Sequence, residues 1–174
     1  MTTPGGTILD ETTAATLLPP RDPRGHKGTF GRVLVVADSL DYAGAALMSG
    51  AAALRAGSGL ATLCVPASVQ ATIAGRVPEL ITRGLPEVAP GELDGIDSAA
   101  ELAELVADAV LVGPGLRPGR GTTRLTQALL ASEGPPLVAD AGALEALSRI
   151  PRWWARLARP VIVTPHPGEF ARLG

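Results

Sequence analysis

Short apolar runs that alternate with longer helical segments constrain the fold of this chain more than any other feature. Five such runs, each rich in Val, Leu or Ala, cover Val33–Ala37, Leu60–Val65, Ala109–Val112, Pro136–Ala139 and Val161–Val163. Continuous apolar runs of this length are typical of strands that are covered on both faces. Because helical segments separate them, they indicate βαβ units, and the sequence therefore predicts a parallel sheet.

The segments between these runs carry helix-forming residues. We expect helices over Gly44–Ala56, Ser98–Ala107, Thr122–Ala131 and Ala143–Leu147. Right-handed crossovers place such helices on both faces of a sheet. The predicted fold class is therefore α/β, a doubly wound and mostly parallel sheet flanked by helices.

Two segments fall outside this pattern. Residues 1–20 are rich in Thr, Pro and Ala and are predicted to be an N-terminal extension with a short helix around Glu11–Leu17. Residues 21–174 are predicted to form the domain. Within it, Gly75–Ile96 is weakly patterned, and Leu80–Leu85 has the composition of an edge strand.

The amino-acid composition limits what the core can be built from and which partners the protein can have. Only 3 % of the 174 residues are aromatic although 46 % are apolar, so the core must be built from Ala, Val and Leu. Fifteen basic against seventeen acidic residues give a net charge of −2, which argues against a nucleic-acid partner. No apolar run approaches the ~20 residues that span a bilayer. We therefore expect a cytoplasmic protein with no membrane partner.

The single cysteine, Cys64, lies inside an apolar run and is interpreted as a small core residue rather than a nucleophile. One cysteine cannot form a disulfide framework, which suits a reducing cytosol. The glycine-rich stretch Gly25–Gly31 is interpreted either as a flexible loop or as a backbone contact for an anion.

Small and polar residues follow the predicted strands. Ala45 begins the Ala-rich helix after the first strand, Gly113 and Gly115 flank a proline after the third, and Asp140 follows the fourth. Ligands bind at the carboxyl edge of open α/β sheets, so we expect these residues to meet there.

Alternatives stay open for two of these positions. The helix N-terminus at Ala45 could hold a phosphate through free N–H groups, or Asp41 could simply cap the helix. Asp140 could orient a ligand hydroxyl or a metal-bound water, or it could cap the helix that follows. The sequence identifies no metal ligand.

The segment Thr164–Phe170, TPHPGEF, is the most specific motif. It follows the apolar run Val161–Val163, and a buried strand that ends in a turn with two prolines and a glycine places His166 at the carboxyl edge. A histidine between prolines beyond a strand has little packing reason to be there, so His166 is a candidate ligand contact.

The strings HKGTFGRVLVVA, SLDYAGAAL, AALRAGSGLATL, VGPGL, DAGAL and TPHPGEFARL together resemble the carbohydrate kinase-like domain of ADP/ATP-dependent NAD(P)H-hydrate dehydratase. The resemblance runs from about Leu17 to Gly174 and implies a ribokinase-like fold. It implies a metabolite-repair lyase that returns hydrated NAD(P)H, NADHX and NADPHX, to NAD(P)H. It also implies ADP or ATP and Mg²⁺ as cofactors, and a homo-oligomer. Ala45, Gly115 and His166 would line the substrate pocket, with Gly113 and Asp140 on the same wall.

Three departures from the family pattern bear on activity. The family's GTGD segment, with its catalytic Asp, lies downstream of TPHPGE, so we expect a C-terminally incomplete domain that is inactive alone, and the catalytic residue stays unknown. Asp38 and Arg117 stand where the family usually has glycine. The carboxylate of Asp38 could repel a phosphate and fill space that a ligand needs.

The alternatives are a degenerate, non-catalytic nucleotide-binding fragment, or a small-molecule kinase of the same superfamily. In either case an unpaired sheet edge would favour self-association.

Overall fold

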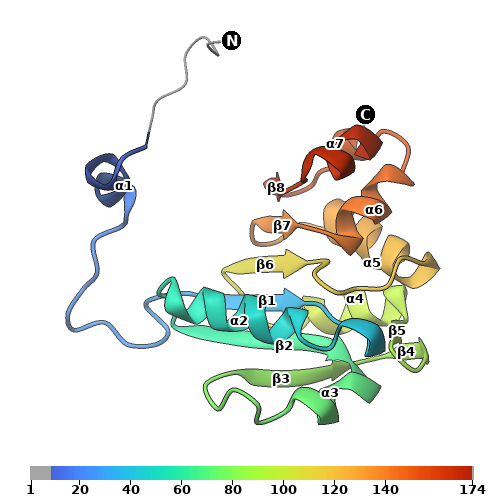
Figure 1. The fold of residues 1–174 in the computed structure, drawn as a ribbon, viewed down its shortest axis with the longest axis horizontal. Helices are drawn as coiled ribbons and strands as arrows, with labels where there is room; N and C mark the ends of the chain where they lie inside the picture. Colours follow the sequence, from blue (N-terminus) through green and yellow to red (C-terminus); the bar gives the residue numbers. More distant parts are fainter. Residues whose placement is uncertain (1–8, 174) are drawn as a thin grey trace.

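A six-stranded parallel sheet forms the centre of the protein (Figure 1). The computed structural model describes residues 9–173. The strands are β1 (Arg32–Val36), β2 (Leu60–Pro66), β3 (Ile81–Leu85), β6 (Ala109–Val112), β7 (Leu137–Ala139) and β8 (Val161–Val163). Their order is β3-β2-β1-β6-β7-β8, so the chain winds outward in both directions from β1. This confirms the doubly wound fold and places its switch point between β1 and β6, where a ligand crevice is expected.

Helices cover both faces of this sheet. On one face lie α2 (Ala45–Arg55) and α3 (Ala67–Ile73), and on the other α4 (Gly95–Ala103), α5 (Arg120–Ala131) and α6 (Gly142–Ser148). Because successive strand residues point to opposite faces, the core divides into two apolar clusters. Cys64 is fully buried in the cluster under α4 to α6, as the sequence predicts.

The weakly patterned segment contains more structure than expected. Strand β3 confirms the predicted edge strand, but α3 and the antiparallel pair β4 (Glu87–Ala89) and β5 (Glu92–Leu93) are missed. Helix α4 also begins earlier than the predicted Ser98, because Asp94 caps it by accepting the N–H groups of Ile96 and Asp97.

Strand β8 is not the buried strand that the sequence predicts. It is the last strand of the sheet, and Ile162 is 60 % exposed. Ile162 is in register with Val138 of β7, which is in register with Leu111 of β6. On this face α2 and α3 lie over β1 to β3 (Figure 1), and in the apolar row Leu111–Val138–Ile162 the first two residues are half-buried and Ile162 is exposed.

The TPHPGEF motif is not simply a turn, because helix α7 (Pro167–Leu173) begins inside it. Proline is well suited to a first helical position. The Glu169 carboxylate accepts the His166 N–H at 3.0 Å, and His166 Nδ1 accepts the Gly168 N–H at 3.1 Å. This reciprocal arrangement resembles a capping box, with histidine in the place usually held by serine or threonine.

The predicted N-terminal helix is confirmed as α1 (Glu11–Leu17), which lies apart from the sheet in Figure 1. Asp10 caps it by accepting the Thr13 N–H at 2.7 Å. The short 3₁₀ turns η1 (Leu40–Tyr42) and η2 (Trp153–Ala155) complete the fold. None of the helices within residues 9–173 is both long and apolar enough to cross a bilayer.

Candidate functional site at the carboxyl edge

The loops after β1 and β6 touch at the switch point. A Cβ added to Gly115 would lie 2.9 Å from the Cβ of Ala45 and 3.2 Å from the Cα of Asp38. Gly115 also has a φ of +71°, which only glycine adopts freely. The structure therefore brings together the predicted residues Ala45 and Gly115, which are seventy positions apart in the sequence.

The β6 loop is equally close to the tip of β7. Gly113 has a φ of +120°, and a Cβ there would lie 1.8 Å from the Asp140 carbonyl oxygen. The Gly113 carbonyl accepts the N–H groups of Leu116 and Gly142. Gly113 is thus required for backbone packing, whatever else it contacts.

Asp140 connects β7 to β8 rather than capping the next helix. Its carboxylate accepts a hydrogen bond from the Thr164 hydroxyl at 2.9 Å. Helix α6 has Ala141 at its N-cap and no side-chain cap, so the capping interpretation of Asp140 is wrong. A ligand-binding role for Asp140 stays a prediction.

His166 lies at the same edge but beyond β8, the outermost strand. Its side chain is 64 % exposed, and its Nε2 lies 3.4 Å from the Glu169 carboxylate. The cap that these two residues form orients α7, and Glu169 reaches a pocket at the tip of β6.

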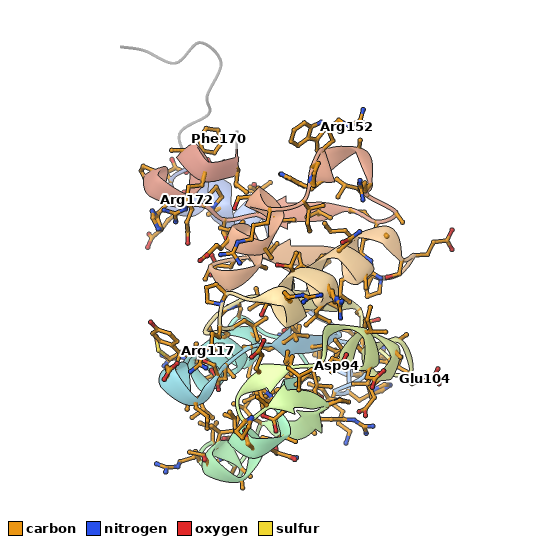
Figure 2. The ribbon with its side chains drawn as sticks, turned by 90° about the vertical axis from the view of Figure 1, so that its right-hand side faces the viewer. Asp94, Glu104, Arg117, Arg152, Phe170 and Arg172 are labelled. Atoms are coloured by element: carbon orange, nitrogen blue, oxygen red, sulfur yellow. The ribbon has the colours of Figure 1, made fainter. Side chains whose placement is uncertain are left out.

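That pocket has a volume of about 320 Å³, and Figure 2 faces the edge that contains it, with Arg117 and Arg172 on the left. We call it the Gly115 pocket, and its lining residues come from the loops after β1, β6 and β7 and from α6 and α7. They are Tyr42, Gly115, Leu116, Pro118, Ala141, Gly142, Glu145, Glu169 and Arg172.

Of the five predicted site residues, only Gly115 lines this pocket. Gly113, Asp140 and His166 lie in loops at the same edge, and Ala45 is the first residue of α2. Sequence reasoning missed Tyr42, Glu145, Glu169 and Arg172. A signal existed for the last two, because a helix that starts at Pro167 places positions three apart on one face. Tyr42 and Glu145 carry no comparable signal.

Asp38, which stands where the family usually has glycine, lies inside the fold and holds the loop after β1 to α2. The residue is fully buried with a φ of +72°, and its Oδ1 accepts the Ala46 N–H at 2.7 Å. Burial raises the pKa of this carboxyl, and hydrogen bonds from the N–H groups of Ala46 and Ala45 oppose the rise. Its own N–H donates to the Pro114 carbonyl at 2.9 Å, which joins the β1 and β6 loops.

Asp38 bears on both interpretations of the α2 N-terminus. The Ala46 N–H is already taken by this internal carboxylate, so that donor is not free for a phosphate. Asp41 does not cap α2 either. It pairs instead with Arg117, the third departure from the family pattern.

Within residues 9–173, no group of three or more His, Cys, Asp or Glu side chains is arranged to hold a metal ion. Mg²⁺ in nucleotide enzymes is usually held by one or two carboxylates together with the phosphates. The described residues therefore do not form a metal site by themselves.

Comparison with known proteins decides the family. The family model for NAD(P)H-hydrate dehydratase matches residues 33–174. The chain belongs to this family. A bifunctional NAD(P)H-hydrate repair enzyme Nnr from Moorella thermoacetica is 43 % identical over 159 residues, which are 90 % of this chain and 30 % of that protein. An ADP-dependent (S)-NAD(P)H-hydrate dehydratase from Xanthomonas campestris is 40 % identical, over 87 % of this chain and 50 % of that protein.

Solved structures confirm the ribokinase-like fold of this dehydratase family member. The Bacillus subtilis ADP/ATP-dependent NAD(P)H-hydrate dehydratase, co-crystallised with ATP and Mg²⁺, matches with a TM-score of 0.73 and 32 % identity. A ribokinase-like superfamily protein from Enterococcus faecalis matches with a TM-score of 0.75 and 25 % identity. The matches cover 94 % and 95 % of this chain but 54 % and 55 % of those chains. The chain thus spans about half the length of these dehydratases, and about a third of the bifunctional enzymes.

Proposed function

We propose that this chain supplies the substrate-binding part of an ADP- or ATP-dependent NAD(P)H-hydrate dehydratase, a lyase that returns NADHX and NADPHX to NAD(P)H. The observation that carries this proposal is the Gly115 pocket, which lies at the switch point between β1 and β6 of the parallel sheet. Family membership supplies the reaction, and the pocket supplies a place for the substrate.

The pocket chemistry suits a dinucleotide. The aromatic ring of Tyr42 offers a face to a flat ring, and glycines 115 and 142 let the backbone come close to it. The guanidinium of Arg172 suits the pyrophosphate. Ala45, Gly113, Asp140 and His166 remain our proposed outer wall, because their loops adjoin the pocket.

Catalysis needs more than the described residues offer. A phosphoryl acceptor hydroxyl requires a positioned base and anion-binding donors, and we identify neither here. In the proposed reaction, a bound nucleotide with Mg²⁺ would convert the substrate hydroxyl into a better leaving group. The described residues form no metal cluster by themselves. We therefore expect binding without turnover.

The test uses the purified chain and measures two quantities. Titration calorimetry should detect binding of NADHX, and Gly115→Val should abolish it because the added side chain collides with Ala45. Gly75→Ala, at a glycine with a similar φ and open space around it, is the matched control. Absorbance at 340 nm should not recover with ADP or ATP and Mg²⁺. Absence of binding would favour the non-catalytic fragment, whereas recovery at 340 nm would contradict our expectation of inactivity.

We further propose that the chain self-associates in the cytoplasm. The row Leu111–Val138–Ile162 supports association, because apolar surface on an uncovered sheet face favours contact with another protein surface. The buried free thiol of Cys64 is consistent with a reducing compartment.

A further inference from the structure

A second pocket at the same edge is lined by arginines. Its volume is about 330 Å³, and Gly119, Arg120, Thr123, Arg124 and Arg149 line it. We call it the arginine pocket. Arg120 and Arg124 lie one turn apart at the start of α5, and Arg149 comes from the end of α6, so two helices contribute three arginines to the lining of this open pocket.

Two of the three arginines are available to an anion. Among the described residues, Arg120 and Arg124 form no ion pair, whereas Arg149 binds the Glu145 carboxylate at 2.5 Å. Two further acids lie close by, since the Glu92 Oε1 would lie 3.4 Å from a Cβ on Gly119, and Asp94 precedes Gly95, whose added Cβ would lie 2.8 Å from the Arg124 Cβ.

The N-terminus of α5 adds positive electrostatic potential to the arginine pocket. The helix has twelve residues, its N-cap is Gly119, and no side chain caps it. Its first N–H groups and the positive end of its dipole therefore lack the internal carboxylate that α2 has in Asp38. Arginine forks and the backbone N–H groups of a helix N-terminus are both common in phosphate-binding sites.

The arginine pocket adjoins the Gly115 pocket. Pro118 lines the Gly115 pocket and its neighbour Gly119 lines the arginine pocket. Glu145 and Arg149, which are joined by an ion pair, likewise stand one in each. The two pockets are therefore neighbours on this edge, one residue apart along the β6 loop and one ion pair apart on α6.

We propose that the arginine pocket is a subsite for a phosphate monoester of the dinucleotide, namely the 2′-phosphate that distinguishes NADPHX from NADHX. This inference rests on the proposed function, since it requires a dinucleotide in the Gly115 pocket. A monoester carries more negative charge per phosphorus than the bridging pyrophosphate and presents three terminal oxygens to a guanidinium fork. An arginine beside a bound ribose is a known way to accept this group.

The experiment compares NAD⁺ with NADP⁺, which differ only by the 2′-phosphate, by calorimetry on the full chain. NADP⁺ should bind about tenfold more tightly, the effect of one charge-assisted hydrogen bond. Arg120→Gln and Arg124→Gln should each remove most of this preference while leaving NAD⁺ affinity unchanged. Arg76→Gln, at an exposed arginine in the loop between α3 and β3, is the matched control and should keep the preference.

Each other outcome overturns the inference, and the outcomes separate it from the proposed function. Equal affinities for NAD⁺ and NADP⁺ would refute the subsite while leaving the Gly115 pocket in place. If the arginine variants weaken ADP binding instead, the subsite takes the terminal phosphate of the nucleotide and not the 2′-phosphate. If none of the three ligands binds, the subsite proposal fails, and the NADHX titration decides the proposed function separately. Both arginines are exposed, so the variants should melt like the parent, which circular dichroism checks.

Discussion

The Asp38 carboxylate accepts a hydrogen bond from the Ala46 N–H at 2.7 Å and thereby caps α2 from eight residues away. Its second oxygen, Oδ2, is buried and has no hydrogen-bond partner among the described residues. A carboxylate in this position fixes the loop after β1 against α2, but the charge is poorly satisfied. The protonated form is therefore favoured, and the pKa of Asp38 lies above its usual value of 3.8.

This raised pKa predicts a pH-dependent effect of Asp38→Asn. The folded protein retains the Asp38 proton to higher pH than the unfolded chain does. The stabilising contribution is thus complete below pH 3.8 and is lost as pH rises through the raised pKa. Asparagine tolerates the positive φ and carries no charge, so the variant should melt about 2–4 °C higher at neutral pH.

Melting curves between pH 4 and pH 8 test this prediction, with the difference between variant and parent narrowing toward the acid end. Asp97→Asn, at an exposed carboxylate on α4, is the control and should show no such trend. A variant that is less stable than the parent at pH 7 would mean that the α2 dipole outweighs burial.

Gly113→Ala should destabilise the protein severely. Its φ of +120° disfavours any side chain, and the added methyl group would lie 1.8 Å from the Asp140 carbonyl, a backbone atom that cannot rotate away. We expect a loss of about 4 kcal/mol or more, which is diagnostic of a steric clash. Chemical denaturation measures it.

Gly75→Ala provides the control for this experiment. Gly75 also has a positive φ, +74°, but no atom lies within 4 Å of an added Cβ. It should lose only the conformational cost of about 1–2 kcal/mol. If both variants lose the same amount, the clash at Asp140 is relieved by a small backbone shift.

The strands of the sheet can be predicted from the sequence, whereas most residues that line the Gly115 pocket cannot, and particular residues show why. Apolar runs such as Leu60–Val65 report burial directly, so the strands were predicted within one residue or so. Arg172 reaches the Gly115 pocket only because α7 begins at Pro167. A proline beside a glycine indicates a turn rather than a helix start, so the sequence does not predict this contact. The prediction that β8 is a buried strand is wrong, because a run of three apolar residues does not reveal where the strand lies in the sheet order.

Cys64 should resist thiol reagents until the protein unfolds. Burial raises the pKa of its thiol to about 12, so almost no thiolate exists at pH 8. Relative to a free cysteine, with a pKa near 8.5, its thiolate fraction is lower by about a thousandfold. Labelling with a chromogenic disulfide at pH 8 should therefore proceed slowly in buffer and at the free-thiol rate in denaturant. Rapid labelling without denaturant would show that β2 opens locally.

Ile162→Lys should reduce self-association without lowering stability. Ile162 is 60 % exposed on the last strand and extends the apolar row from Leu111 and Val138. A lysine there places charge on a sheet edge, which is a common protection against edge-to-edge contacts. Because the side chain is already exposed, the melting temperature should change little.

Sedimentation velocity over a concentration series measures the effect. Ile96→Lys is the matched control, since Ile96 is 56 % exposed on α4 and lies outside the row. The parent and Ile96→Lys should form larger species as concentration rises, and Ile162→Lys should remain smaller. A parent chain that sediments as a monomer at every concentration would contradict self-association through β8. If Ile162→Lys and Ile96→Lys change the sedimentation equally, the contact between copies does not lie on β8.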